Sequence, residues 1–239
     1  MNTAKSAIVT GGERGIGKAI VGLLETKGFH VSVLGLDLEL AKELPPSVDF
    51  IQCDVSQFDA VEKAIDNICS KTSRLDALIC NAGIADPGTK EIDFCSPEDW
   101  KRVIEVNLGG PFYCAKAATP YLRQAKGSIV NIASIRGIRS EANTFAYTAS
   151  KGGLISLTHS LAASLGPSIR VNSVSPGWIL TGDDYTPTPE DHSQHWSGRV
   201  GKAEDVAQMV AYLVSDKAEF ITGQDFVVDG GVSKKLSYV

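Results

Sequence analysis

Short apolar runs and longer amphipathic segments alternate along the whole chain. The apolar runs contain many β-branched residues, as strands buried on both faces do, and they lie at residues 5–10, 30–34, 48–53, 75–80, 127–133, 169–174 and 225–229. Apolar positions with helical spacing occupy residues 15–27, 37–44, 57–72, 97–124, 145–165 and 203–215. This alternation predicts an α/β fold, with a parallel sheet, helices on both of its faces and right-handed crossovers.

The chain has no internal repeat, low-complexity tract or Pro/Gly-rich linker that would mark a domain boundary. Its 239 residues, 43% of them apolar, therefore predict a single doubly wound domain, residues 1–239. No run of eighteen apolar residues occurs, and the N-terminus enters a predicted strand almost at once. We expect neither a membrane span nor a signal peptide.

Charge and cysteine content narrow the classes of partner and location. A net charge of −5 and a pI near 5.4 argue against nucleic acid as the main partner. The cysteines are odd in number, scattered and without a Cys-x-x-Cys pair: Cys53, Cys69, Cys80, Cys95 and Cys114. This usage is typical of reduced cysteines in a cytoplasmic protein.

The first predicted strand leads into a glycine-rich turn, Gly11-Gly12-Glu13-Arg14-Gly15-Ile16-Gly17, and then into a helix. A strand, a glycine turn and a helix N-terminus place free backbone N–H groups and the positive helix end at one point, which suits a pyrophosphate. The spacing is G-x-x-x-G-x-G and not the commoner G-x-G-x-x-G, and a glycine turn alone is often only a hinge. Its place at the start of a βαβ unit favours nucleotide binding.

A second group combines Ser134 with Tyr147-Thr-Ala-Ser-Lys151. A phenol and an ammonium four residues apart on a helix share one face, so the cation can lower the pKa of the phenol. A serine at a preceding strand end can share a substrate oxygen with that phenol. The group is suited to proton transfer to or from an alcohol or a carbonyl.

Four candidate residues lie where predicted strands end. Thr10, Asn81, Ser134 and Pro176 all lie just past such an end. Ligands of doubly wound sheets bind beyond the carboxyl ends of the strands, at the point where the strand order reverses. We therefore expect these residues to converge on one crevice.

These features together resemble the short-chain dehydrogenase/reductase family over essentially the whole chain. The matching segments are Thr10–Gly17, Asp54-Val55, Asn81-Ala82-Gly83, Asn107, Ser134, Tyr147 with Lys151, Pro176-Gly177, and Ile221–Gln224 with Asp229–Gly231. The resemblance implies a Rossmann fold with a seven-stranded parallel sheet in the order 3-2-1-4-5-6-7. It also implies hydride transfer between a nicotinamide cofactor, NAD or NADP, and a secondary alcohol or ketone.

The resemblance implies a role for each of four catalytic residues. Tyr147 is the general acid in reduction and the general base in oxidation, and Ser134 holds the substrate oxygen. Lys151 lowers the pKa of Tyr147 and bonds the nicotinamide ribose. Asn107 kinks the predicted helix 97–124 and carries a water chain from Lys151 to solvent; the alternative is an ordinary polar helix residue.

The cofactor-binding residues implied by the resemblance come from several loops. They are Gly11, Glu13, Arg14, Gly15, Ile16, Gly17, Asp37, Asp54, Val55, Asn81, Ala82, Gly83, Tyr147, Lys151, Pro176, Gly177, Ile179 and Thr181. Asp54 and Val55 flank the adenine, and Thr181 touches the nicotinamide carboxamide.

The choice between NAD and NADP depends on the end of the second strand. The acidic residue that would bond the adenine ribose is replaced by Gly35, with Leu36 next and Asp37 two residues further on. If the strand runs on, Asp37 reaches the ribose and NAD is bound. If it does not, Asp37 opens the next helix, and Arg14, where a basic residue often meets a 2′-phosphate, favours NADP. Between the two we favour NAD.

Residues 178–200 correspond to the substrate lid of the family, and the short lid is typical of a small or loosely held substrate. Trp178 and Trp196 wall an apolar pocket or are packing residues. His192 and His195 have metal-like spacing without a third ligand, so we expect a solvated face and no metal site. Arg136 and Arg139 bind a substrate anion or are exposed loop arginines. The sequence does not identify the substrate.

A non-catalytic cofactor-binding or scaffold protein of the same fold is the alternative function. It predicts erosion of the tetrad or of the phosphate turn, and neither is seen. The sugar-nucleotide epimerases and dehydratases need a further C-terminal domain for which 239 residues leave no room. The resemblance also implies a homotetramer, formed through helices 97–124, 145–165 and 203–215 and the last strand, with a dimer as the alternative.

Overall fold

The computed structural model describes residues 4–85, 91–182 and 185–235. Seven parallel strands form its main sheet in the order β3-β2-β1-β4-β5-β6-β9. They are β1 Ser6–Thr10, β2 His30–Gly35, β3 Asp49–Gln52, β4 Ala77–Cys80, β5 Ser128–Ile132, β6 Arg170–Pro176 and β9 Asp225–Val228. The predicted strand order is confirmed. The last strand is numbered β9 because two further strands, β7 Ile179–Leu180 and β8 Gly201–Lys202, form a separate small sheet that the sequence analysis did not predict.

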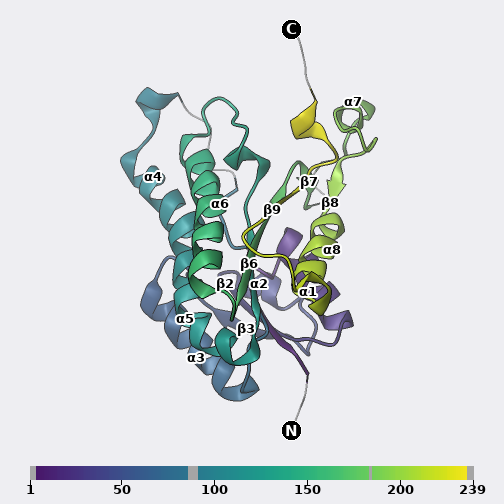
Figure 1. Cartoon of the computed structure of the whole chain (residues 1–239). Helices are drawn as coiled ribbons and strands as arrows, with labels where there is room; N and C mark the ends of the chain where they lie inside the picture. The colour runs from purple at the N-terminus through teal and green to yellow at the C-terminus, as the bar shows by residue number, and fades with distance from the viewer. Residues whose placement is uncertain (1–3, 86–90, 183–184, 236–239) are drawn as a thin grey trace.

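Helices cover both faces of the sheet, as the alternating pattern predicts (Figure 1). They are α1 Gly15–Thr26, α2 Leu38–Ala41, α3 Phe58–Thr72, α4 Pro97–Ile104, α5 Gly110–Ala125, α6 Phe145–Leu165, α7 Pro189–Ser193 and α8 Ala203–Leu213. Figure 1 shows α3, α4, α5 and α6 on one side of the sheet and α1 with α8 on the other. The fold is that of a doubly wound Rossmann domain.

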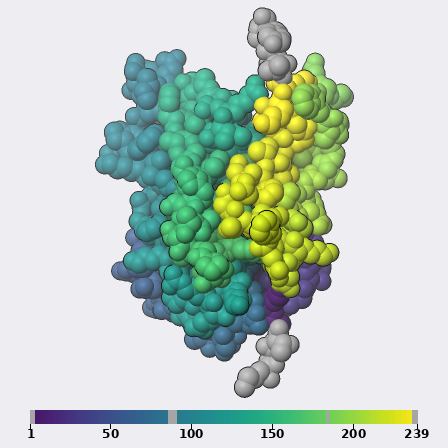
Figure 2. All heavy atoms as spheres, in the orientation of Figure 1, coloured from purple at the N-terminus to yellow at the C-terminus, as the bar shows by residue number. Residues whose placement is uncertain are grey.

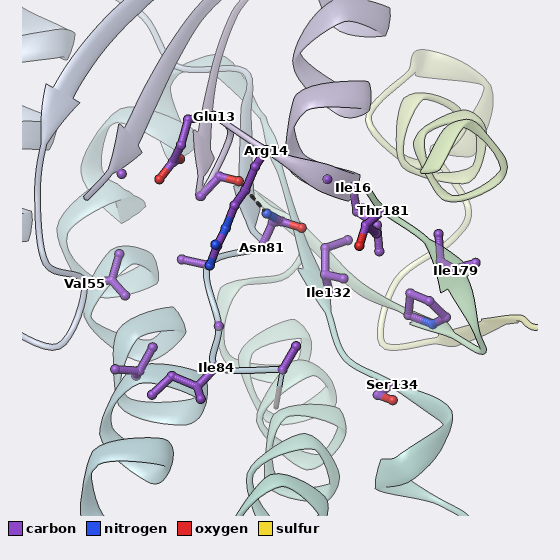
Figure 3. A pocket seen from close by; sticks show the side chains of 18 of the residues that line it. Glu13, Arg14, Ile16, Val55, Asn81, Ile84, Ile132, Ser134, Ile179 and Thr181 are labelled. Carbon is purple, nitrogen blue, oxygen red and sulfur yellow. Dashed lines mark hydrogen bonds between the residues drawn. The ribbon is translucent and has the colours of Figure 1, made fainter. Parts of the chain in front are cut away.

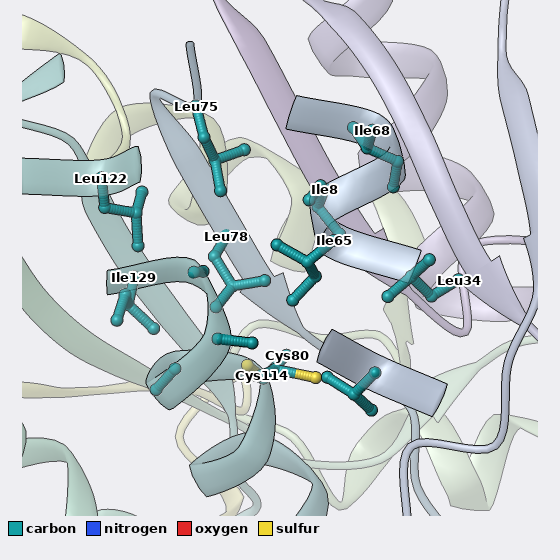
Figure 4. Packing of buried hydrophobic residues seen from close by; sticks show 14 of the residues in the cluster. Ile8, Leu34, Ile65, Ile68, Leu75, Leu78, Cys80, Cys114, Leu122 and Ile129 are labelled. Carbon is teal, nitrogen blue, oxygen red and sulfur yellow. The ribbon is translucent and has the colours of Figure 1, made fainter. Parts of the chain in front are cut away.

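Each face of the sheet has its own apolar core. Figure 4 shows the core beneath α3 and α5, where Ile8, Leu78 and Ile129 of three adjacent strands meet Ile65 and Leu122 of the helices. On the opposite face, the alternate residues of the same strands pack against α1 and α8. Strands buried on both faces account for the continuous apolar runs in the sequence.

The predicted single helix 97–124 is wrong in one respect. It is divided into α4 and α5 by a π-helical turn, Glu105–Gly109, in which the N–H of Gly110 donates to the carbonyl of Glu105 five residues back. Pro111 has no N–H and so cannot make the usual α-helical bond to the carbonyl of Asn107. The wider turn directs Asn107 into the protein, where its side chain is fully buried.

Candidate active site

The carboxyl ends of the central strands open onto a cavity of about 1320 Å³ (Figure 3). Of the predicted cofactor residues, all but Gly17 line it, and so does Ser134. Asn107 lies outside the lining. Lining residues that the sequence analysis missed are Leu34, Gly35, Leu36, Cys53, Ile84, Ala85, Arg102, Val106, Ile132, Ala133, Leu180, Gly182 and Tyr185. Leu36, Cys53 and Ala133 directly follow strands, and for these residues that position was the available signal.

The glycine turn is packed so tightly that side chains are excluded from it. A Cβ on Gly17 would lie 2.1 Å from the carbonyl oxygen of Gly11, and Gly11 has a φ of +62°. The N-terminus of α1 begins at this turn with no side-chain cap and no acidic residue in its first turn. Its first N–H groups thus face the cavity without a competing side-chain acceptor, and the turn fits a pyrophosphate.

Asn81, at the end of β4, braces this turn from the neighbouring strand. Its amide nitrogen Nδ2 donates to the carbonyl oxygens of Thr10 at 3.0 Å and Gly11 at 2.9 Å. The hydroxyl of Thr10 in turn accepts from the backbone N–H of Asn81 and of Ala82, each at 2.9 Å. These bonds hold β1 and β4 together where their ends meet the cavity.

Ser134 and Tyr147 meet at the opposite end of the cavity. Ser134 follows β5 and begins a short 3₁₀ turn, in which its Oγ accepts the N–H of Arg136 at 3.1 Å. Tyr147 lies in the first turn of α6. Burial raises the pKa of the Tyr147 phenol above its usual value, against the opposing effects of a hydrogen bond from Ser134 and the charge of Arg136.

Lys151 lies one turn beyond Tyr147, with Nζ 5.7 Å from the centroid of the Tyr147 ring. It is 5% exposed, and Nζ donates to the carbonyl oxygen of Ile132 at 2.8 Å. Burial lowers the pKa of Lys151 to about 8. In this structure the groups that lower the Tyr147 pKa are Ser134 and Arg136. The lowering expected from Lys151 together with the charge of an oxidised nicotinamide stays a prediction.

Asn107 joins the π-helical turn to two neighbouring segments. Its Oδ1 accepts the N–H of Ile84 at 2.8 Å, while Nδ2 donates to the carbonyl of Ile84 at 3.1 Å and to Ser150 Oγ at 3.2 Å. Gly83 separates it from Lys151: a Cβ at Gly83 would lie 3.2 Å from Asn107 Oδ1 and 3.6 Å from Lys151 Nζ. The side chain positions the loop after β4 beside the lysine.

At the adenosine end, β2 stops at Gly35 and does not continue to Asp37. Asp37 caps α2, with Oδ1 accepting the N–H groups of Glu39 at 3.0 Å and Leu40 at 3.1 Å. Of the two alternatives given above, this is the one in which the strand does not run on, Asp37 opens the next helix and Arg14 favours NADP. Asp54, after β3, likewise accepts from the N–H and the hydroxyl of Ser56.

The lid segment 178–200 is anchored at its base by the pairing of Ile179 with Gly201 and of Leu180 with Lys202. Trp178 lines the cavity together with Tyr185, their ring centroids 6.0 Å apart, whereas Trp196 is 65% exposed and outside the lining. Asp183 and Asp184 lie outside the described residues.

The candidate substrate and metal residues of the sequence analysis have other partners. His192 accepts the N–H of Val200 at 3.1 Å. The expected solvated face is wrong for His195, which is buried, with its Nδ1 3.1 Å from the carbonyl oxygen of Asp191. Arg136 is paired with Glu141, and Arg139 donates to the carbonyl of Ser233. None of the four lines the cavity. Across residues 4–85, 91–182 and 185–235, no cluster of three or more His, Cys, Asp or Glu has a metal-binding arrangement.

The cysteines and helices of the described part of the chain have two further properties. Cys53, Cys69, Cys80 and Cys114 are free thiols and buried, whereas Cys95 is exposed. Within the same part of the chain, no helix has the length and apolar character needed to cross a membrane.

Comparison with known proteins gives matches over nearly the whole chain. A family model described as enoyl-(acyl carrier protein) reductase matches residues 11–233. An uncharacterized oxidoreductase of Thermotoga maritima is 40% identical, over all of this chain and 99% of the relative. A 3-oxoacyl-[acyl-carrier-protein] reductase of Chlamydia trachomatis is 35% identical over 96% of this chain and 97% of its own. Among solved structures, the aldohexose dehydrogenase of Thermoplasma acidophilum in ligand-free form superposes with a TM-score of 0.91 at 34% identity, covering 99% and 96% of the two chains.

Proposed function

The chain belongs to the short-chain dehydrogenase/reductase family of oxidoreductases, and from this premise we propose that it transfers a hydride between NAD(P) and a secondary alcohol or ketone. In this proposal Tyr147 is the general acid and base. The observation that carries it is the convergence of Ser134, Tyr147 and Lys151 on the cavity that also contains the glycine turn of α1. A cofactor-binding scaffold would not need these three groups beside the nicotinamide end.

In the proposed reaction, different residues of this chain have different roles. The nicotinamide, when bound, supplies or accepts the hydride. Ser134 and Tyr147 hold the substrate oxygen, and in reduction the phenol gives its proton to that oxygen as the carbonyl carbon receives the hydride. Since burial raises the pKa of Tyr147, the phenol is held in the protonated form that reduction requires. A positive charge nearby favours the phenolate that oxidation requires.

The position of Lys151 supports a role for this residue in the proton transfer. Its Nζ is already oriented by the carbonyl of Ile132, which leaves two of its three N–H donors for a ribose hydroxyl and a water. Asn107 holds the adjoining loop through Ile84. We propose that the water chain implied by the family runs past Gly83, the residue that separates these two side chains.

The substrate end of the cavity is bounded by Trp178 and Tyr185 from the lid. These two rings favour a substrate with an apolar or planar face beside its carbonyl. The relatives give two starting chemistries, a 3-oxoacyl thioester and an aldohexose. We propose to test both, together with simple ketones and secondary alcohols.

The experiment follows absorbance of the reduced cofactor with each substrate, in the purified wild-type protein and in Tyr147→Phe. The variant keeps the ring and removes only the hydroxyl. We expect it to lose at least about 10²-fold in kcat, the usual contribution of a positioned acid or base, while its affinity for the cofactor stays within a few-fold. Unchanged turnover in Tyr147→Phe would show that this acid/base assignment is wrong, and binding without turnover on any substrate would favour the scaffold alternative.

Assembly into a homotetramer of single-domain subunits is part of the proposal. Large apolar side chains are exposed on the elements that the family uses for assembly, including Phe112 on α5 and Phe145 on α6. Val227 of β9 is 37% exposed on the last strand of the sheet, and Phe220 is fully exposed shortly before it. Figure 2 shows this C-terminal segment at the surface beside α6. Exposed apolar side chains on these elements favour burial against further copies of the chain.

A further inference from the structure

An acidic side chain is present at the end of β2, although the sequence has glycine at the usual position. In dinucleotide-binding sheets, an acid about twenty residues after the glycine motif bonds the 2′-hydroxyl of the adenosine ribose. Here that position is Gly35, which has no side chain to offer. The Glu13 side chain from the glycine turn lies there instead, beside the strand ends (Figure 3).

The contacts of Glu13 locate its carboxylate closely. Oε1 accepts the backbone N–H of Leu36 at 3.2 Å, the first N–H beyond β2. A Cβ built on Gly35 would lie 2.3 Å from Glu13 Oε2 and 2.6 Å from both Cδ and Oε1. The carboxylate of Glu13 thus occupies the space in which a side chain at position 35 would begin.

The surroundings of this carboxylate leave part of its bonding capacity unused. Glu13 is 5% exposed and lines the cavity. Its Oε2 has no hydrogen-bond partner among the described residues. A buried carboxylate oxygen without a hydrogen-bond donor is unfavourable. A hydroxyl group of a bound ligand would supply the donor that Glu13 lacks.

We propose that Glu13 is the residue that selects NAD(H) over NADP(H), a proposal that rests on the proposed function. The 2′-hydroxyl of the adenosine ribose donates to the Glu13 carboxylate after a small adjustment of the side chain. A 2′-phosphate brings negative charge and no donor to the same place, and is repelled at close range in a partly desolvated site.

The other two charged candidates for this selection are Asp37 and Arg14. The Asp37 carboxylate is occupied by the first N–H groups of α2 and would leave them unpaired if it turned to the ribose. Arg14 lines the cavity and would attract a phosphate. Glu13, the adjacent residue, places a negative charge at the strand end that opposes a 2′-phosphate there.

Calorimetric titration with NADH and with NADPH tests this assignment without any substrate. We expect the wild-type protein to bind NADH at least about tenfold more tightly than NADPH, the effect of one hydrogen bond to a charged group. Glu13→Gln, which keeps the shape and removes the charge, is expected to reduce that ratio by about tenfold. Asp37→Asn, a matched neutralisation that can still cap α2, is expected to keep the wild-type ratio.

Three results would overturn the assignment: a wild-type preference for NADPH, an unchanged ratio in Glu13→Gln, or loss of the preference in Asp37→Asn. In each of these the proposed function would stand, because a cofactor is still bound. Binding of neither cofactor by folded protein would instead remove the proposed function and this inference with it. If Glu13→Gln does not fold, the double variant Glu13→Ser/Gly35→Asp returns the acid to β2. It is expected to retain the NADH preference, whereas a preference for NADPH in that variant would count against the inference.

Discussion

Burial of Lys151 should make the stability of the protein depend on pH in a specific direction. The native pKa of this lysine is lowered from 10.5 to about 8 because its ammonium group is desolvated. Between those two values the unfolded chain binds more protons at this site than the folded chain does. The free energy of unfolding attributable to Lys151 therefore rises as pH increases from 8 towards 10.5, and the cost of burying the charge is fully present below pH 8.

The size of this effect follows from the shift. At 1.36 kcal/mol per pKa unit, it corresponds to about 3 kcal/mol in total, of which about 2 kcal/mol is recovered between pH 7 and pH 9.5. Solvent screens this charge very little, because Lys151 is 5% exposed. Lys151→Met removes the charge but also leaves the Ile132 carbonyl without its donor, a loss of about 1–3 kcal/mol. The two terms nearly cancel at pH 7, so the slope with pH is the informative quantity.

The assay is urea unfolding of the wild-type protein and Lys151→Met at several pH values from 7 to 9.5, without cofactor. The difference in unfolding free energy between them removes the contribution of all other titrating groups. We expect the wild type to gain about 2 kcal/mol relative to the variant over this range. A difference that stays constant within about 0.5 kcal/mol would show that Lys151 is not desolvated in the folded protein, and would refute the reasoning.

Three further predictions concern the turn, the π-helical segment and assembly. Gly17→Ala gains about 1 kcal/mol of helix propensity, but its Cβ would lie 2.1 Å from a backbone oxygen. We therefore expect calorimetry to show at least tenfold weaker cofactor binding. Undiminished binding would contradict the packing of the turn. Asn107→Ala leaves the backbone N–H and carbonyl of Ile84 unpaired, so urea unfolding should show a free energy of unfolding lower by about 2 kcal/mol or more. A decrease below about 0.5 kcal/mol would count against the role of Asn107 in holding the loop after β4. Light scattering should give a mass near four times 25.4 kDa, and a monomeric mass would rule out the proposed tetramer.

The five central strands were predictable because they are runs buried on both faces of the sheet, whereas the edge strands β3 and β9 are partly exposed and were recognised by their short apolar stretches. Every predicted strand lies within two residues of the observed one at either end. The division of α4 from α5 was harder to predict, since helical spacing of apolar residues tolerates a single wide turn. β7 and β8 are two residues each and exist through a pairing between residues 179 and 201, which no local pattern indicates.

Most residues that line the candidate cavity could be named from the sequence, but the directions of their side chains could not. Spacing places Tyr147 and Lys151 on one helix face, yet the choice of the Ile132 carbonyl as the partner of Lys151 depends on where β5 ends. For the same reason the sequence could not show Arg136 turning towards Glu141. Glu13 appeared in the sequence only as a member of the turn, because its proximity to Gly35 arises from the packing of β1 against β2.

The contact between Glu13 and Gly35 also couples these two positions during the evolution of the cofactor site. Any side chain gained at position 35 would meet the carboxylate of Glu13, and the end of that flexible side chain would have to turn away. Loss of Glu13 first would leave the site without an acid until position 35 changed. A lineage that moves the acid from the turn to β2 therefore has to displace or shorten residue 13 when residue 35 enlarges, so the effect of a substitution at either position depends on the residue at the other. The two positions, twenty-two apart in sequence, form a single epistatic unit.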